Sequence, residues 1–252
     1  MSSCIVQSFS VRTRIIFVCV VSVLAIASCA SQGSAVGDTS DMAKVYLVQQ
    51  GPVPGQSGNF WVGLDGTLVE KRPWGGTADD SATGMFFLAA DEKNLYFRAE
   101  VQDVSPNLRP LDLEVAQAWN GTSLQFFFGT KTAKHPAYDE GDNNLSIWAV
   151  QEEDGSYGAR VAMSGRLMNE RQHKAAVVEW KEKSFIIEAS FSFDSLSIFK
   201  PFKPGQKVRC EFRINQAALD SDRSYIINWK TPTDDAWHDP NVWSDGIVVQ
   251  KP

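Results

Sequence analysis

The sequence has little of what most catalytic and transition-metal sites require, with three histidines and four cysteines in 252 residues. The histidines, His135, His173 and His238, do not accompany a nucleophile-elbow motif, so nothing in the sequence supports Ser-His-Asp catalysis. Three of the cysteines fall within the first 29 residues, which leaves Cys210 unable to form a disulfide within the rest of the chain. Cys210 alternates with apolar residues along a predicted strand, and we expect a buried thiol.

Positive charge is also scarce, because 24 Lys and Arg stand against 30 Asp and Glu and give a formal net charge of −6. An acidic surface repels phosphate backbones, so nucleic acid is not an expected partner. A glycosidase would need two facing carboxylates, one of them with a raised pKa. Strand alternation predicts that Glu100, Glu179 and Glu188 are solvated residues on outward faces, and no feature pairs them. The sequence therefore does not predict an enzyme.

The chain shows no hydrophobic run long enough to span a bilayer, which takes about 20 residues. Its apolar stretch at residues 15–27 has 13, follows two arginines, and leads through small residues to Cys29. This N-terminus resembles a bacterial lipoprotein signal, in which the cysteine is lipidated and becomes the new N-terminus. The resemblance implies a signal peptide over residues 1–28 and a lipidated Cys29 with a flexible tether over residues 29–44. We expect anchoring in the bacterial cell envelope, with the outer membrane or cell surface favoured.

Period-two alternation is abundant in the remaining sequence. Apolar and polar residues alternate over residues 95–102, 124–128 and 185–193. Each segment therefore has one apolar face, as half-buried antiparallel strands require. Turn-forming sequences separate the runs, at residues 91–94, 153–156 and 203–206. The pattern predicts an all-β domain over residues 45–252, a single antiparallel β-sandwich with a few short helices, at residues 111–118, 194–199 and 215–220.

Tryptophan is plentiful, with eight in the chain. Trp119 and Trp237 each stand among small polar residues at the edge of a predicted strand, whereas a buried structural tryptophan usually lies in an apolar run. A pyranose ring has apolar C–H faces and a rim of hydroxyl groups, so a sugar site combines flat aromatic rings with fixed polar side chains. The setting of these two rings predicts sugar binding rather than catalysis.

Five strings in order carry a family resemblance, at residues 64–68 with Trp74, 91–103, 119–127, 185–215 and 227–246. The string W-N-G-T-S-L-Q-F-F at residues 119–127 matches the pattern W-x-x-D-S-V-E-I-F, and W-H-D-P at residues 237–240 matches W-x-D-P. Together the strings resemble the family 9 carbohydrate-binding modules, a β-sandwich family related to the DOMON superfamily. The resemblance covers residues 45–251.

The resemblance implies a non-catalytic module in which Trp119 and Trp237 hold the end of a mono- or oligosaccharide, or of a glycan, between their rings. By motif position it implies further ligand-binding residues, which are Gln125, Ser146, Trp148 and Asp234. Such modules often accompany xylan-active enzymes. Since this sequence has no catalytic domain, the expected protein partner is a separate glycoside hydrolase or a surface protein.

The sequence departs from the family pattern at the polar rim of this slot. Thr122 stands in place of an aspartate and Gln125 in place of a glutamate. Ser146 and Trp148 fall where the family has an arginine and an asparagine. These changes predict a rim that is mostly neutral and more aromatic, so either the preferred sugar has changed or sugar binding has been lost.

Two cofactor alternatives stay open. Some family members carry structural Ca²⁺, and the acidic loop at residues 139–143 offers the hard oxygen ligands that this ion prefers, although a solvated acidic turn is the favoured interpretation. Some DOMON relatives bind haem through a methionine and a histidine. Here Met85, Met163 or Met168 would have to pair with one of the three histidines, and no spacing supports a pair.

The remaining alternative is a structural or protein-interaction lipoprotein that has kept the sandwich and lost the sugar slot. In that case Phe60, Trp61 and Trp148 are the candidate residues of a protein interface, because aromatic side chains are enriched in such interfaces. Capture of a protein partner, without a Soret band or a fluorescence response to saccharides, would favour this alternative.

Overall fold

The computed structural model describes residues 41–71, 82–104, 106–108, 119, 121–135, 137–218 and 221–252, without the side chains of residues 217, 218 and 221–224. By its internal contacts the chain divides into Met1–Gly37 and Asp38–Pro252, and all described residues belong to the second unit. The expected signal peptide, Cys29 and the expected helix at residues 111–118 lie outside the described residues. Among those that are described, no helix is long and apolar enough to cross a membrane.

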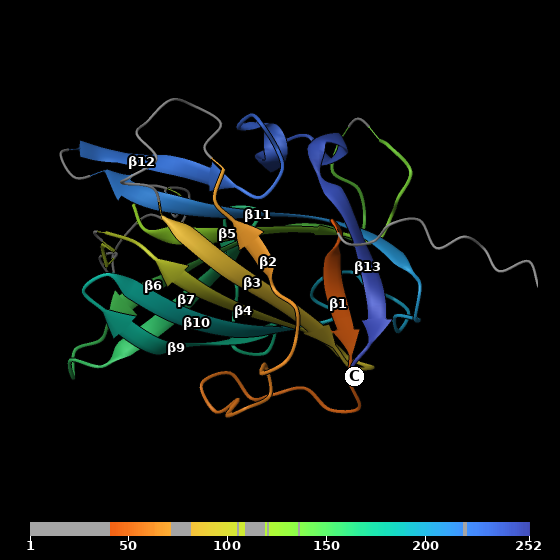
Figure 1. Cartoon of the computed structure of the whole chain (residues 1–252), viewed down its shortest axis with the longest axis horizontal. Coiled ribbons are helices and arrows are strands. Elements are labelled where there is room, and N and C mark those ends of the chain that lie inside the picture. The colour runs from red at the N-terminus through yellow and green to blue at the C-terminus, as the bar shows by residue number, and fades with distance from the viewer. Residues whose placement is uncertain are drawn as a thin grey trace, which may run out of the picture. The chain divides into compact units, whose positions relative to one another are not determined.

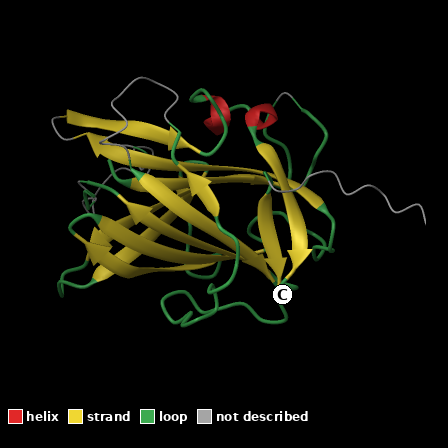
Figure 2. Cartoon of the chain, viewed as in Figure 1, coloured by secondary structure: helices red, strands yellow, loops and turns green. Residues whose placement is uncertain are grey.

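The described chain forms an all-β domain, as predicted (Figures 1 and 2). Its strands are β1 Ala43–Leu47, β2 Thr67–Val69, β3 Thr83–Ala90, β4 Asn94–Gln102, β5 Ser123–Gly129, β6 Asp142–Gln151, β7 Tyr157–Met163, β8 Arg166–Leu167, β9 His173–Lys181, β10 Ser184–Ser192, β11 Lys207–Ala218, β12 Ser221–Asn228 and β13 Ser244–Gln250. Two short 3-10 helices, η3 Asp235–Trp237 and η4 Pro240–Val242, precede the last strand. The three alternating segments all became strands, β4, β5 and β10.

The expected helices are wrong where the structure describes them. Residues 194–197 form turns rather than a helix, and residues 198 and 199 have no regular structure. Residues 215–218 continue β11, because each of them pairs with a residue of β12. Their polar sequence alone did not indicate this pairing. The helical segments of the described chain lie instead in the loop before β13, where the hydrogen-bonded turns of η3 and η4 are each three residues long.

One curled sheet connects the strands, in the order β8-β7-β6-β5-β11-β13-β1-β3-β4-β10-β9 (Figure 1). The long strand β11 pairs with β5 along one edge, and along its other edge with β13 at its start and β12 at its end. Strand β1 lies parallel to both β13 and β3, a pairing that the alternation pattern did not predict. A bridge between Lys71 and Asn228 further joins the β2 segment to β12.

Phenylalanine rings fill the interior of the curl. Phe126 of β5 stacks on Phe212 of β11 with ring centroids 5.4 Å apart, and on Phe97 of β4 also at 5.4 Å. Each of these rings is fully buried, and burial of such large apolar surface is the main stabilising contribution to the fold. Cys210 lies in the same core, where burial raises the pKa of its thiol, so the predicted core thiol is confirmed.

The prediction that Glu188 is a solvated surface residue is wrong. Its side chain is 1% exposed, because the loop before β2 covers the outer face of β10. Arg98 of β4 forms an ion pair with the Glu188 carboxylate, and the hydroxyl of Ser57 and the backbone N–H of Gly55 donate to it. Glu100, which also pairs with Arg98, stays 42% exposed. Glu188 is thus a structural charge that holds a loop on the sheet.

Candidate functional site

A row of polar side chains crosses the outer face of the sheet, on the side opposite the phenylalanine core. Arg213 of β11 pairs in register with Asn228 of β12 on one side and with Gln125 of β5 on the other. Gln125 in turn pairs with Ser146 of β6. Residues directly opposite each other in neighbouring strands share a face. The row therefore brings two predicted site residues, Gln125 and Ser146, beside two that the sequence analysis did not single out, Arg213 and Asn228.

Arg213 is the centre of this polar face, although its side chain is only 3% exposed. Its Nε donates to Asn228 Oδ1 at 2.9 Å, and its Nη1 donates to Asp234 Oδ1 at 2.6 Å and to Gln125 Oε1 at 3.3 Å. The guanidinium also lies over the ring of Phe127, 5.4 Å from its centroid. Burial lowers the pKa of Arg213, and the Asp234 carboxylate opposes that shift. A buried cation is tolerated only when it is paired in this way. The rim, which was predicted to be mostly neutral, therefore contains a buried ion pair between Arg213 and Asp234.

Asn215 adds a second fixed donor next to Arg213. It lies two residues further along β11 and pairs in register with Ser123. Its Nδ2 donates to Ser123 Oγ at 3.1 Å and to Gln125 Oε1 at 3.4 Å. The amide oxygen of Gln125 therefore accepts from two side chains of β11.

Side chains of β11 and β12 hold the loop after β12 against this face. The buried carboxylate of Glu211 accepts hydrogen bonds from the backbone N–H groups of Trp229, Lys230 and Thr231 and from the Thr231 hydroxyl. Burial raises the pKa of Glu211, and these hydrogen bonds oppose the shift. The Nδ2 of Asn228 donates to the carbonyl oxygens of Thr231 and Thr233. Side chains of β11 and β12 thus fix the loop that leads to η3.

Trp237 projects from this fastened loop. The preceding residue, Ala236, is fully buried, and its carbonyl oxygen accepts from Trp243 Nε1 at 2.9 Å and from the Tyr138 hydroxyl at 3.1 Å. The Trp237 side chain is 54% exposed, and its ring contacts that of His238 with centroids 4.6 Å apart. An exposed indole on a fixed backbone is a suitable platform for the apolar face of a sugar ring.

Trp119 lies four residues before β5, the strand that carries Ser123 and Gln125, and its side chain is 52% exposed. The nearby Thr122 is buried, and its hydroxyl accepts from the backbone N–H of Asn107 at 2.8 Å. Of the seven tryptophans that the structure describes, Trp119 and Trp237 are the two whose exposed fraction is above one half. Their assignment as a pair of sugar-binding rings stays a prediction.

Three other predicted residues lie on or beside the same face. Asp234 is the partner of Arg213, and Ser146 is half-buried in the row with Gln125. Trp148 follows on β6, but it is 3% exposed and packs with Val150 and Ala162. Its role as a ligand contact stays a prediction. Little of its ring is exposed to a ligand.

The interface residues of the interaction alternative do not form an exposed aromatic patch. Trp61 is 5% exposed and Trp148 is 3% exposed. Phe60 packs against Trp61 with ring centroids 4.9 Å apart, and the ammonium of Lys251 lies 4.0 Å from the Phe60 centroid. These rings contribute to packing within the domain.

The acidic loop left open as a calcium site contacts basic side chains in the structure. Lys131 pairs with Asp139, and the His135 ring lies 3.4 Å from the Asp142 carboxylate. Burial raises the pKa of Asp142. Within the described part of the chain, no group of three or more His, Cys, Asp or Glu side chains could hold a metal ion.

The haem alternative would need a histidine as an iron ligand. In the structure, His135 and His173 each use Nδ1 for a hydrogen bond to a backbone carbonyl oxygen, that of Ala137 and that of Asn169 respectively.

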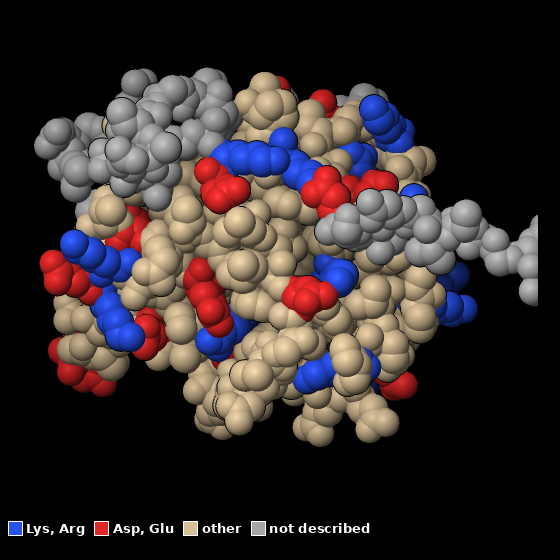
Figure 3. Space-filling view, in the orientation of Figure 1, with Lys and Arg blue, Asp and Glu red and all other residues tan. Residues whose placement is uncertain are grey.

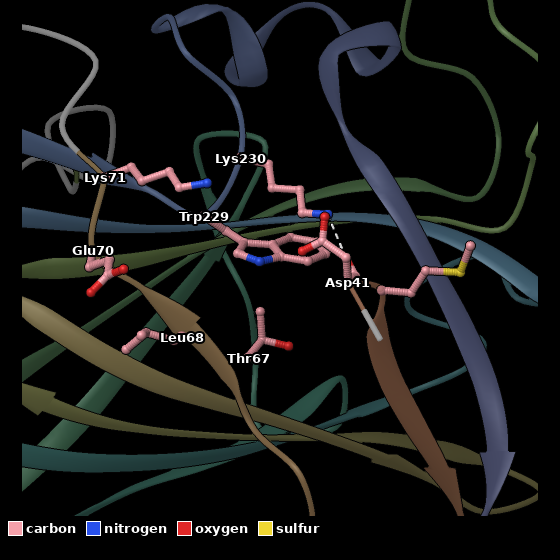
Figure 4. A pocket seen from close by; sticks show the side chains of 8 residues that line it. Asp41, Thr67, Leu68, Glu70, Lys71, Trp229 and Lys230 are labelled. Carbon is pink, nitrogen blue, oxygen red and sulfur yellow. Dashed lines mark hydrogen bonds and ion pairs between the residues drawn. The ribbon is translucent and has the colours of Figure 1, made fainter. Parts of the chain in front are cut away.

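A groove of about 250 Å³ elsewhere on the domain also contains a tryptophan (Figure 4). Trp229 is 7% exposed, and the Lys230 ammonium lies 4.8 Å from its ring centroid. Figure 4 shows Lys230 reaching over this ring to Asp41, with which it forms an ion pair of 2.7 Å. The accessible face of Trp229 is therefore occupied by the protein itself, and this groove does not present a sugar platform.

Charges of both signs are interspersed on the face seen in Figure 3, where lysines and arginines lie next to aspartates and glutamates. The mixed charges on this face agree with the acidic composition of the chain.

Comparison with known families assigns the chain to a known type of module. Residues 53–251 match the family model described as "Carbohydrate family 9 binding domain-like". The chain belongs to this family. It is a non-catalytic family whose modules also occur in xylanases, so the resemblance drawn from the five sequence strings is confirmed.

The curated relatives are large enzymes. Endo-1,4-beta-xylanase A of Thermotoga neapolitana is 26% identical over 175 residues, 69% of this chain. Endo-1,4-beta-xylanase A of Thermotoga maritima is 25% identical over the same length. Exoglucanase XynX of Acetivibrio thermocellus is 20% identical over 200 residues. The chain spans only 15% to 16% of the length of these proteins.

Two solved structures share the fold. Both are of a family 9 carbohydrate-binding module from Caldicellulosiruptor kristjanssonii, one in complex with cellotriose and one with glucose. Each superposes with a TM-score of 0.60 over 83% of this chain and at least 95% of the module, at 16% and 18% sequence identity. The family β-sandwich fold is therefore confirmed.

The buried polar residues of β11 and β12 were missed by the sequence analysis. Arg213 and Asn215 alternate with Phe212 and Ile214, a pattern that indicates a strand with one solvated face. The alternation is correct, but the loop carrying Trp237 covers that face, so its polar residues are buried and fixed. A charged residue flanked by phenylalanine and isoleucine near the tryptophan-rich C-terminal string was the available signal.

Proposed function

We propose that this module binds the end of a glucose or cello-oligosaccharide chain on the polar face of β5, β6 and β11, with Trp119 and Trp237 as the aromatic walls. The observation that carries the proposal is the pairing of a buried polar network with two exposed indoles. A sugar ring needs both, since its C–H faces stack on aromatic rings and its hydroxyls require fixed hydrogen-bond partners. The modules solved with cellotriose and glucose support this class of ligand.

Polar groups on the face have unused hydrogen-bonding capacity, which further supports a ligand site. The Oδ1 of Asn144 is buried without a partner, and Asn144 lies on β6 next to Ser146 on the same face. Within the described chain, Ser146 Oγ makes no hydrogen bond either. Nearly all buried polar groups in proteins are paired, so unpaired ones call for an explanation. Ser146 is partly exposed, so a sugar hydroxyl would pair with its Oγ.

The test is a titration of the purified protein with glucose, cello-oligosaccharides and xylo-oligosaccharides, monitored by tryptophan fluorescence. We expect saturable quenching by glucose-type sugars, and its loss in Trp237→Ala and in Trp119→Ala. Phe199→Ala is a suitable control, because Phe199 is 72% exposed and lies in the segment after β10 rather than on β5, β6 or β11. Absence of a response to every saccharide would overturn the proposal and favour the protein-interaction alternative.

We further propose that the module is held in the bacterial cell envelope by lipidation of Cys29 and works beside a separate glycoside hydrolase. The support is the signal-like N-terminal sequence and the family's occurrence in xylanases. One acyl chain gives only reversible membrane binding, so several would be needed for a stable anchor. Fatty-acid labelling tests this, with Cys29→Ala expected to lose the label and to leave the membrane fraction. Labelling that persists in Cys29→Ala would contradict it.

A further inference from the structure

Two side chains of β11 set the orientation of the Gln125 amide. Arg213 Nη1 lies 3.3 Å and Asn215 Nδ2 lies 3.4 Å from Gln125 Oε1. A guanidinium group carries only donors, so the amide atom that faces Arg213 has to be the oxygen. The opposite orientation would place N–H groups against each other and leave a buried donor of Arg213 without an acceptor.

The amide nitrogen of Gln125 is consequently turned away from β11. Within the described part of the chain, Gln125 Nε2 has no hydrogen-bond partner. It is also not fully buried, unlike the unpaired Asn144 Oδ1. The side chain as a whole is nearly buried, with 5% of the residue exposed. An unpaired atom that is not fully buried must contribute to this small exposed surface, so the N–H₂ group reaches the space above the polar face.

Arg213 itself is not placed to contact a ligand. It is 2% exposed, and its donors are directed to Asn228, Asp234 and Gln125. Its charge is compensated within the protein by Asp234. Arg213 therefore acts on a ligand only through Gln125, because it fixes the direction of the Gln125 amide.

We propose that Gln125 Nε2 is a fixed hydrogen-bond donor to the ligand, with Arg213 and Asn215 as positioning residues, so that the site selects sugars presenting an acceptor oxygen at this point. The proposal rests on the sugar-binding function proposed above. A glutamate at this position can only accept, and would bind a hydroxyl through its proton. Gln125 in this orientation binds the same hydroxyl through its lone pair, or binds an ether or carboxylate oxygen that has no proton.

Isothermal titration with glucose and its monodeoxy and monodeoxyfluoro analogues tests this. The fluorine of a deoxyfluoro sugar is a weak hydrogen-bond acceptor and cannot donate. The hydrogen at the same position of a deoxy sugar neither accepts nor donates a hydrogen bond. For the unaltered protein we expect one ring position at which the deoxyfluoro sugar binds about threefold or more tightly than the deoxy sugar, the effect of retaining part of a hydrogen bond. In Gln125→Glu the difference at that position should disappear, because a carboxylate offers no donor. Gln151→Glu, on the exposed end of β6, is the matched control.

Two variants test the positioning roles. Arg213→Met removes the group that fixes the amide and allows it to turn over, whereas Asn215→Ala removes only the second donor and loosens the amide while Arg213 still faces its oxygen. The ratio of deoxyfluoro to deoxy affinity should then fall toward one, a readout that a general loss of stability does not produce. If Arg213→Met fails to fold, the Gln125→Glu comparison still decides whether the amide donates to the ligand, and a partial fall of the ratio in Asn215→Ala tests the positioning role.

The outcomes separate this inference from the function on which it rests. If the protein binds glucose but shows equal affinity for deoxy and deoxyfluoro sugars at every position, the fixed donor is overturned and sugar binding stands. Retention of the same pattern in Gln125→Glu would overturn it as well. If the protein binds no saccharide, both proposals are overturned.

Discussion

The indole nitrogen of Trp243 lies 2.9 Å from the carbonyl oxygen of Ala236, the residue immediately before Trp237. The hydroxyl of Tyr138 donates to the same carbonyl oxygen at 3.1 Å. Ala236 is buried against Phe127 and Trp243, so the backbone under Trp237 is fixed before any ligand arrives. A preorganised ring loses less conformational freedom on binding, which favours affinity.

Replacing Trp237 by alanine removes one aromatic wall. By analogy with other stacking sites, we expect a loss of about 1–3 kcal/mol of sugar-binding free energy. Thermal stability should change little, since more than half of the Trp237 side chain is exposed. Titration calorimetry together with a melting curve checks both statements. Unchanged sugar affinity in this variant would exclude Trp237 from the site.

Trp243→Phe removes the indole N–H that fixes Ala236 while retaining most of the aromatic volume. We expect weaker sugar binding by about 1 kcal/mol, the usual net value of one hydrogen bond, because the Trp237 platform loosens. Trp229→Phe is the matched control, since Trp229 is also a buried tryptophan, packed on Phe212 rather than beneath η3. Both variants should lose stability in urea unfolding, but only Trp243→Phe should lose affinity. Equal affinities would show that the Ala236 contact does not support the site.

Glu188→Gln breaks a buried ion pair with Arg98 and should lower the free energy of unfolding by about 1–3 kcal/mol, because Arg98 loses its buried partner and keeps only the more exposed Glu100. Glu100→Gln removes the other partner of Arg98, but Glu100 is 42% exposed, so its loss should stay within about 1 kcal/mol. Urea unfolding of both variants measures the contrast. Similar losses for the two would contradict the structural role assigned to Glu188.

His173 should make stability depend on pH below neutrality. Burial lowers the pKa of His173 below the ordinary 6.5, and the Asn169 carbonyl and Glu170 oppose the shift. Between the two pKa values the unfolded chain binds the proton more readily than the folded protein. Stability from this group is therefore complete above pH 6.5 and falls as the pH drops through the folded pKa.

The measurement is urea unfolding at about pH 7.5 and about pH 5.5, on either side of the ordinary histidine pKa. His173→Gln has no proton to bind in this interval and should lose less stability on acidification than the unaltered protein. An equal loss in both proteins would assign the acid sensitivity to other groups.

The strands were predictable because half-buried antiparallel strands leave a local mark. The alternating segments around Phe97, Phe126 and Phe191 became β4, β5 and β10, and Cys210 is in the core as expected. Helices were overpredicted for the opposite reason. Short polar segments such as residues 215–218 have no strong local preference, and pairing with β12 decided their conformation.

The candidate site was predictable only in part. The polar surroundings of Trp119 and Trp237 correctly indicated exposed rings, and the family strings placed Gln125 and Ser146, which the structure brings into one row. The ion pair between Arg213 and Asp234 was not foreseen, because the two residues are 21 positions apart in the chain.

The sequence alone determined the period of the strands, the poverty in catalytic side chains and the family to which the module belongs. These properties depend on residue type and local spacing. Tertiary structure decided which outward-facing side chains are buried, as with Glu188 and Arg213, because a loop from elsewhere in the chain lies over each of them. It also decided which way the Gln125 amide points. That direction depends on donors of another strand, and no local pattern in the sequence records them.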